Sequence, residues 1–226
     1  MAIDYTVWPT PTQVFNLLTS SGIVPTLTVG DDLAQLRIDA AVKTLSQKTG
    51  RRFLPVTESK NFDGSGSGLL TVDEFIYGSI TSITLYTLPA YSTINVIGYC
   101  EVIRDEFPCT QIQILQGPAN VLYGWFSNWP QGRSNIEIAA TWGYGTTIPE
   151  DVWEAVLYKA AADIFDADKA NVRGVHNSIK DDDVTINYGS ALPSIITNWR
   201  AEWTRVLIDY KRPLRNFLRR NEVPLI

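Results

Sequence analysis

The sequence is poor in the residues that carry most enzyme and metal chemistry: its 226 residues include one histidine, two cysteines and one methionine. It contains no apolar run of about 18 residues, the length that a membrane-spanning helix needs. Its first residues show no basic stretch followed by an apolar one, so we expect no secretory signal. A hydrophobic content of 45% with 19% charged residues is typical of a globular chain. We therefore expect a soluble, intracellular protein without a membrane partner.

The candidate catalytic and ligand-binding patterns are all incomplete. His176, the single histidine, is accompanied by no nucleophile motif of the G-x-S-x-G type. The acidic triplet Asp181 to Asp183 lacks the alternating spacing of a calcium loop. Gly64, Gly66 and Gly68 precede a predicted strand, whereas a phosphate-binding glycine loop opens a helix. We therefore expect a protein that is not an enzyme and holds no cofactor or metal.

The two cysteines, Cys100 and Cys109, stand nine residues apart without a C-x-x-C pair or neighbouring histidines that would complete a zinc site. Their position in a strand-rich segment favours two reduced, packed thiols. The alternative is a disulfide across a hairpin, which a reducing cytosol disfavours.

Charge is distributed unevenly along the chain. Five basic residues and one acidic residue give positions 211–226 a charge of +4, while the other 14 basic and 23 acidic residues give positions 1–210 a charge of −9. An acidic body does not suit tight binding of nucleic acid, because phosphate neutralisation supplies most of that affinity. The basic segment is therefore a candidate attachment arm, or alternatively a solvated helix end whose cations offset the helix dipole. Its basic residues are Lys211, Arg212, Arg215, Arg219 and Arg220.

Apolar residues recur at helical spacing near both ends of the chain. Capping residues predict a short helix that begins after Thr10 and ends at Gly22, and a second from Asp31 to Gly50. A third helix should begin at Pro149 and run to about residue 170, and the last carries an apolar stripe over residues 192–210.

Between these helices the apolar period changes from 3.6 residues to 2. Short runs rich in β-branched residues, separated by glycine and proline, predict antiparallel strands because no crossover helix fits between them. The runs are 60–62, 69–72, 80–85, 93–98, 111–115, 121–123 and 136–142, with a further short strand predicted at 184–188.

This order predicts an α+β fold. Neither end has enough helices to bury its own apolar stripe, so we expect one helical bundle built from residues 1–59 and 144–226, with the arm at about 211–226. Residues 60–143 should form an inserted antiparallel β-rich subdomain.

Aromatic residues are abundant, with seven Trp, ten Tyr and eight Phe. Several fall where turns are expected, next to glycine and proline, and such residues commonly anchor contacts between proteins. Ordinary packing is the alternative, while stacking on nucleic-acid bases would need more basic neighbours than Arg133 alone. The candidate contact aromatics are Tyr123, Trp125, Phe126 and Trp129.

In their order along residues 33–210, several segments resemble the head–tail connector proteins of tailed bacteriophages, also called adaptor or head-completion proteins. The segments are L-R-I-D-A-A at 36–41, T-G-R-R-F at 49–53, F-D-G-S-G at 62–66, L-L-T-V at 69–72, I-T-S-I at 80–83, W-P-Q-G at 129–132, N-I-E-I at 135–138, W-G-Y-G at 142–145, I-P-E-D-V at 148–152 and D-V-T-I-N-Y at 183–188.

The resemblance implies a structural virion protein without catalytic activity. Such proteins form a closed ring of about twelve copies beneath the portal protein. The ring extends the channel through which double-stranded DNA passes without sequence-specific binding, and it docks the next neck or tail protein. The resemblance thus implies a protein made in the cytoplasm of the host bacterium and located in the neck of the virion, at the head–tail interface. We place the basic arm on the portal as a hypothesis.

This chain departs from shorter members of the family in a longer interval between residues 80 and 129 and in its basic extension after Tyr210. Partner contacts usually lie in such extensions. Two alternatives stay open: another neck or tail-completion protein, or a β-rich carbohydrate- or receptor-binding module that uses Trp125 and Trp129 as a stacking platform.

Overall fold

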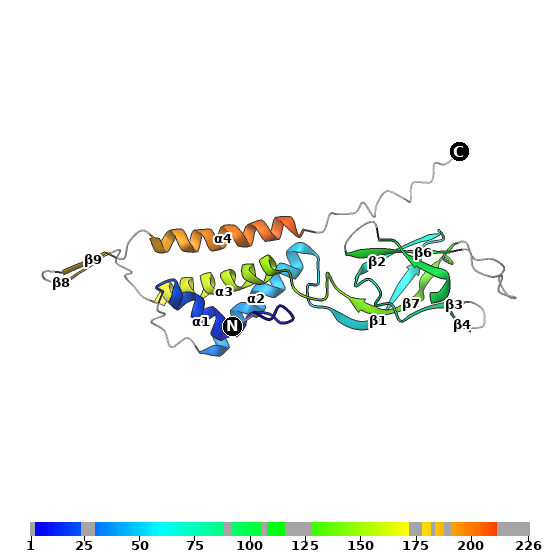
Figure 1. Cartoon of the computed structure of the whole chain (residues 1–226), viewed down its shortest axis with the longest axis horizontal. Coiled ribbons are helices and arrows are strands. Elements are labelled where there is room, and N and C mark those ends of the chain that lie inside the picture. The colour runs from blue at the N-terminus through cyan, green and yellow to red at the C-terminus, as the bar shows by residue number, and fades with distance from the viewer. Residues whose placement is uncertain are drawn as a thin grey trace, which may run out of the picture. The chain divides into compact units, whose positions relative to one another are not determined.

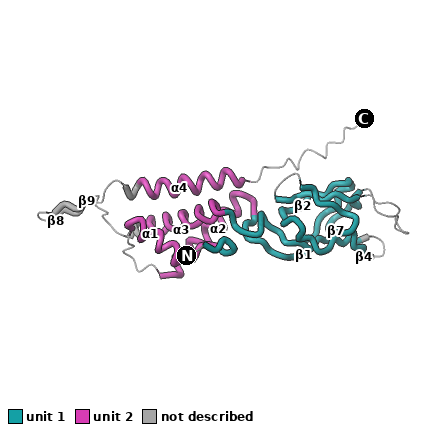
Figure 2. The backbone as a smooth tube through the Cα atoms, in the orientation of Figure 1, with its two compact units in different colours: residues 1–7, 52–149 teal, residues 8–51, 150–226 magenta. Residues whose placement is uncertain are grey.

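The computed structural model describes residues 3–23, 30–87, 92–104, 108–115, 128–171, 178–181, 184–187 and 191–211. The chain divides into two compact units (Figure 2). The strand unit comprises Met1–Val7 and Arg52–Pro149, and the helical unit comprises Trp8–Arg51 and Glu150–Ile226. The predicted α+β class is confirmed, because four helices accompany an antiparallel sheet. None of the helices in the described ranges is long and apolar enough to cross a bilayer.

The helical unit contains α1 (Pro11–Ser20), α2 (Asp31–Thr49), α3 (Glu150–Asn171) and α4 (Ala191–Asp209) (Figure 1). α1 begins at a capping box: the Thr10 hydroxyl oxygen accepts a hydrogen bond from the Gln13 N–H, and the Gln13 side chain accepts one from the Thr10 N–H (2.8 Å). After α1, Gly22 adopts a positive φ of 74°, and Gly50 ends α2 at 69°. Glycine adopts this left-handed conformation without steric cost, so the predicted helix ends are correct.

α3 is the central helix of the unit and contacts each of the other three. Its buried residues lie on more than one face and include a run of alanines, Ala160 to Ala162. Small side chains let neighbouring backbones approach closely, which explains why the helix can be covered on several sides. α4 buries its predicted stripe, and the Trp199 ring stacks on that of Tyr158 in α3, with centroids 5.9 Å apart. The buried α4 residues are Ile196, Trp199, Trp203 and Val206.

The strand unit is one antiparallel sheet in the order β4-β3-β7-β2-β6-β5, with β1 also paired to β7. β7 is the organising strand, because β1 and β3 pair along it and Phe75 of β2 pairs with Trp142. A short 3-10 helix (Ile97–Tyr99) joins β4 to β5. The strands are β1 (Val56–Gly64), β2 (Leu69–Phe75), β3 (Ser82–Thr87), β4 (Ser92–Asn95), β5 (Cys100–Val102), β6 (Cys109–Ile114) and β7 (Gly132–Trp142).

Alternate residues of these strands face a common core, as the period of two predicts. β7 shows the alternation most clearly, with Ile136, Ile138, Ala140 and Trp142 buried. Residues from β2, β3 and β6 complete the cluster, which therefore depends on contacts far apart in the sequence. The cluster comprises Leu70, Val72, Phe75, Ile83, Leu85, Val96, Cys109, Ile112, Ile114, Trp129, Ile136, Ile138, Ala140 and Trp142.

Gly64 marks a close approach between the end of β1 and the segment before β7. A Cβ atom added to Gly64 would lie 1.7 Å from the carbonyl oxygen of Pro130. The Gly64 N–H donates to Asn135 Oδ1 (2.8 Å), and Asn135 Nδ2 donates to the same Pro130 carbonyl (3.0 Å). The glycine thus allows the close packing of β1 against the segment before β7.

Two further strands, β8 (Ser178–Asp181) and β9 (Val184–Asn187), pair as an antiparallel hairpin. β9 agrees with the strand predicted at 184–188. β8 was not predicted, and it ends at Asp181 of the acidic triplet. His176, Asp182 and Asp183 lie outside the described residues.

Candidate assembly interface

The basic arm begins where α4 ends. Of its five basic residues the structure describes Lys211, which is exposed and whose N–H donates to the Ile208 carbonyl oxygen (3.2 Å). The other four, at positions 212, 215, 219 and 220, lie outside the described residues. The described part therefore defines the point from which the arm leaves the helical unit.

Tyr210 holds this point against two other helices. Its phenol donates a hydrogen bond to Asp151 Oδ1 (2.9 Å) in the first turn of α3, and its carbonyl oxygen accepts one from Arg51 Nε (2.7 Å) after the end of α2. The Tyr210 N–H also continues the helical pattern by donating to the Val206 carbonyl (3.0 Å). The residue immediately before the arm is thus fixed to α2, α3 and α4.

Arg205 adds charged contacts around the same point. Its guanidinium pairs with Glu202 and with Asp209 (2.9 Å) on α4, and it lies 3.8 Å from Asp151 Oδ2 on α3. The hydrogen bond between Arg205 and Glu202 raises the pKa of the arginine and lowers the pKa of the carboxyl. Because these groups are largely exposed, water screens the pairs and each adds little stability by itself. Together, these ion pairs orient the C-terminal end of α4 on α3.

The surface between the start of α3 and α4 is acidic. Burial, followed by repulsion from Glu150, Glu202 and Asp151, raises the pKa of Glu154. Burial, followed by repulsion from Glu154 and Glu202, also raises the pKa of the Tyr158 hydroxyl. The arm therefore leaves the helical unit beside carboxylates, in agreement with the negative charge of residues 1–210.

The candidate contact aromatics divide into two groups. Tyr123, Trp125 and Phe126 lie outside the described residues. Trp129 is fully buried in the core of the strand unit, and its indole Nε1–H donates to the Ile112 carbonyl oxygen (3.3 Å). This side chain has no surface to offer a partner, so we correct its assignment from contact residue to core residue. A sugar-stacking platform built on Trp125 and Trp129 loses the second member for the same reason.

Both cysteines are free thiols, Cys100 half-buried in β5 and Cys109 buried in β6. Burial raises the pKa of Cys100 to about 12. Burial also raises the pKa of Cys109, although the Arg104 charge opposes that shift. Thiols with raised pKa values are poor nucleophiles at neutral pH, which indicates a packing role.

Within the described ranges, no group of three or more histidine, cysteine or acidic side chains is arranged to hold a metal ion. The interactions that sequence analysis missed are those of Arg51, Asp151 and Tyr210, whose partners lie in different helices. Of the contacts near Tyr210, the sequence signalled locally the ion pairs of Arg205, because Glu202 and Asp209 stand three and four residues from it on one helix.

No protein-family model matches the chain, and no curated protein matches it. Among solved structures, the chain is similar to a chain in the neck of an empty gene transfer agent particle determined with C6 symmetry, with a TM-score of 0.50 and 17% identity. It is also similar to a chain in the virion of the native gene transfer agent particle, with a TM-score of 0.51 and 16% identity. Each match covers 88% of this chain and 92% of the other. At these identities, what the chain shares with them is the fold.

Proposed function

We propose that this protein is a structural component of the neck of a phage-like particle. The observation that carries the proposal is the similarity of fold over 88% of this chain and 92% of a chain from a gene transfer agent neck, at a TM-score of 0.50. The match spans both compact units rather than one common substructure. The order of segments that resembles phage head–tail connectors supports the same role, which requires no catalysis.

Within the neck, we place the protein as the adaptor between the portal and the next neck or tail protein. The adaptor would be a homo-oligomeric ring of about twelve copies. Each copy would contact the next copy through one surface and the previous copy through a different surface. The negative charge of residues 1–210 suits a channel through which DNA slides, because a basic lining would bind phosphate and slow its passage. The protein would be made in the cytoplasm of the host bacterium and function in the virion.

The arm at 211–226 is the proposed portal contact. Its root is held by the hydrogen bonds of Tyr210 to Asp151 and Arg51, so the basic segment starts from a defined place on the helical unit. Its arginines would pair with carboxylates of the portal, and binding should therefore weaken as salt rises.

Deletion of residues 212–226 should abolish co-sedimentation with the portal while the circular dichroism spectrum keeps its helical signal. The matched control is a full-length variant in which the four arm arginines are changed to glutamine, so that the arm keeps its length and loses these four charges. This variant should bind the portal weakly at all salt concentrations. Undiminished portal binding by the deletion variant would refute the role of the arm.

Negative-stain imaging of the full-length protein mixed with its portal tests the role in the neck separately. We expect rings on one end of the portal. The absence of any ring, with both proteins folded and at micromolar concentration, would contradict the adaptor role whatever the arm does.

A further inference from the structure

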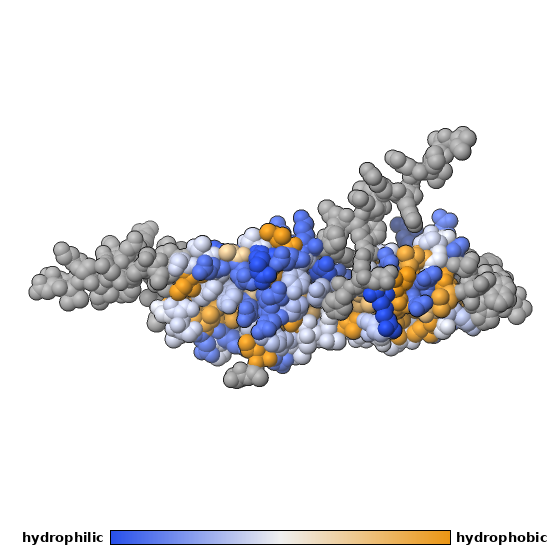
Figure 3. Space-filling view, turned by 45° about the horizontal axis from the view of Figure 1, so that its top comes forward, coloured by the Kyte–Doolittle hydropathy of each residue, from blue (hydrophilic) through white to orange (hydrophobic). Residues whose placement is uncertain are grey.

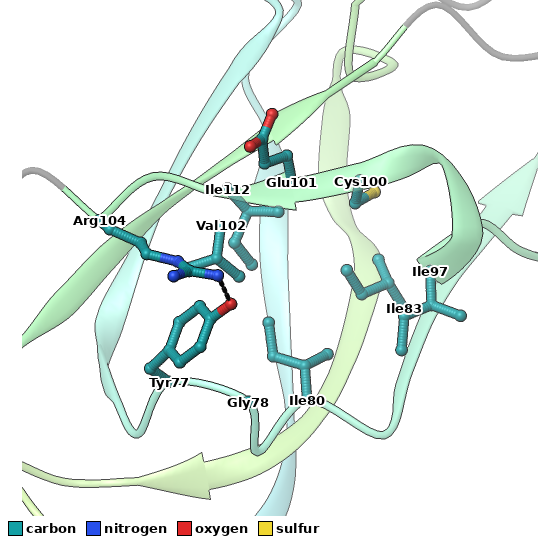
Figure 4. A pocket seen from close by; sticks show the side chains of 10 residues that line it. All are labelled: Tyr77, Gly78, Ile80, Ile83, Ile97, Cys100, Glu101, Val102, Arg104 and Ile112. Carbon is teal, nitrogen blue, oxygen red and sulfur yellow. Dashed lines mark hydrogen bonds between the residues drawn. The ribbon is translucent and has the colours of Figure 1, made fainter.

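The strand unit contains a pocket of about 280 Å³ that the neck role does not explain. It lies among the turn before β3, β3 itself, the 3-10 helix, β5 and β6 (Figure 4). Its walls are mostly aliphatic, and they are provided by Ile80, Ile83, Ile97, Val102 and Ile112. The close-up shows the Glu101 carboxylate directed away from the isoleucines.

Arg104 and Tyr77 form one side of the rim. The Arg104 guanidinium carbon lies 4.0 Å from the centroid of the Tyr77 ring, and the guanidinium donates a hydrogen bond to the Tyr77 hydroxyl. This cation–π contact holds the arginine in place without neutralising it. Arg104 makes no ion pair with any carboxylate in the described ranges, so a positive charge stands at the mouth of an apolar pocket.

Two apolar residues of the lining are exposed to solvent. Tyr77 is 49% exposed and Ile97 36%. Apolar surface on the strand unit is also visible in Figure 3. Tyrosine and arginine, which form this rim, are enriched in the hot spots of protein contacts.

β5 lies at one end of the sheet order and pairs only with β6 among the described strands. The Cys100 N–H already donates to the Ile97 carbonyl oxygen, and the backbone groups of Glu101 and Ile103 face β6. By the alternation of an antiparallel pair, the N–H and C=O of Val102 point to the outer edge, where an extended peptide can add. Strand addition of this kind supplies affinity through main-chain hydrogen bonds and specificity through a pocket for one side chain.

We propose that this pocket and the β5 edge bind an extended segment of another protein, in which a bulky apolar side chain enters the pocket and an acidic side chain two residues away pairs with Arg104. The lining carries two charges, Glu101 and Arg104. The Glu101 carboxylate is directed away from the isoleucines, whereas Arg104 is held at the rim by Tyr77, so the charge nearest to an entering side chain is positive and favours an acidic segment. The strand spacing selects the arrangement, because residues two apart along an extended peptide lie on the same face. The proposal is independent of the ring and of the arm.

The test uses the full-length protein with isotope-labelled isoleucine methyl groups, observed by NMR during peptide titration. The probe is the acetylated and amidated peptide Asp-Thr-Phe-Thr-Asp, which carries an acid on either side of the aromatic residue. We expect saturable shifts of the Ile80, Ile83 and Ile112 methyl signals. The peptide Lys-Thr-Phe-Thr-Lys should bind about fivefold more weakly, the effect of one exposed ion pair, and Asp-Thr-Ser-Thr-Asp should cause no shift.

The variant Arg104→Gln should lower the affinity for the acidic peptide about fivefold and make the acidic and basic peptides equivalent. Arg133→Gln, which removes an exposed arginine from β7, is the matched control and should leave binding unchanged. The proposal is overturned if the acidic peptide at millimolar concentration causes no chemical-shift change of the Ile80, Ile83 and Ile112 methyl signals. It is also overturned if the basic peptide binds as tightly as the acidic one. Shifts of the same signals with protein concentration alone would also overturn it, because the occupant would then be a second copy of this chain.

Discussion

Trp129 is the residue for which the structure reverses the sequence-based assignment, and its removal tests the reversal. Truncation of a fully buried Trp or Phe to alanine costs about 3–5 kcal/mol, from lost apolar transfer and from the cavity that remains. Trp129 packs in the strand-unit core and donates to the Ile112 carbonyl, so we expect Trp129→Ala to fall in this range. Trp129→Phe keeps a six-membered ring and loses one hydrogen bond to a carbonyl that also belongs to the β2–β6 ladder, so the lost bond should cost only about 0.5–1.5 kcal/mol.

Hydrogen exchange is the suitable assay because it reports each unit separately. Amides of β6 and β7 that exchange only when the strand unit opens should exchange roughly two to three and a half orders of magnitude faster in Trp129→Ala. Peptides from α3 should keep their exchange rates if the units open independently. Tyr99→Ala removes an aromatic ring that is 40% exposed in the same unit, and as a matched control it should change exchange by less than about threefold. A Trp129→Ala variant with wild-type exchange would refute the core assignment.

Three further predictions concern single groups. Gly64→Ala should destabilise the strand unit by more than about 2 kcal/mol in urea unfolding, because its Cβ would lie 1.7 Å from the Pro130 carbonyl oxygen. The control Gly98→Ala, where nothing lies within 4 Å, should cost less than about 1 kcal/mol. Equal costs for the two variants would contradict the clash. Tyr210→Phe removes one hydrogen bond to α3 and should lower helical-unit stability by about 0.5–1.5 kcal/mol in thermal unfolding; an unchanged melting temperature would show that the bond is not formed. Burial raises the pKa of Cys100 to about 12, so the thiol of the folded protein should be alkylated at pH 8 about a thousandfold more slowly than a free cysteine. The stability of the folded state should also fall as pH rises from about 9 towards 12, because the unfolded state loses the thiol proton first. An alkylation rate equal to that of free cysteine would contradict the burial.

The helices were predictable because their signals are local. Thr10 with Pro11 begins α1, and Gly50 ends α2, and each signal lies within a few residues of the boundary that it sets. A cap acts on backbone groups of its own first or last turn, so its effect does not depend on the rest of the fold. The predicted helix boundaries are correct for this reason.

The strand pairings and the burial of Trp129 were not predictable in the same way. Trp129 stands between Asn128 and Pro130, which indicates a turn, yet its ring enters a core whose members come from β2, β3, β6 and β7. The Tyr77–Arg104 contact joins residues that are 27 positions apart. Such contacts depend on register and on the curling of the sheet, and neither has a local signature in the sequence.

One ladder brings together the two ends of the long segment of the strand unit, Arg52–Pro149. Val56 pairs with Trp142, and beyond the ladder the Tyr144 N–H donates to the Arg52 carbonyl oxygen (2.8 Å). The chain therefore enters and leaves the strand unit at adjacent points, although nearly the whole sheet lies between them in sequence. Closing a loop of this length costs free energy that grows with the logarithm of its length. The β1–β7 ladder offsets that cost with backbone hydrogen bonds and core burial, so the strand unit itself holds together the two points at which the chain enters and leaves it.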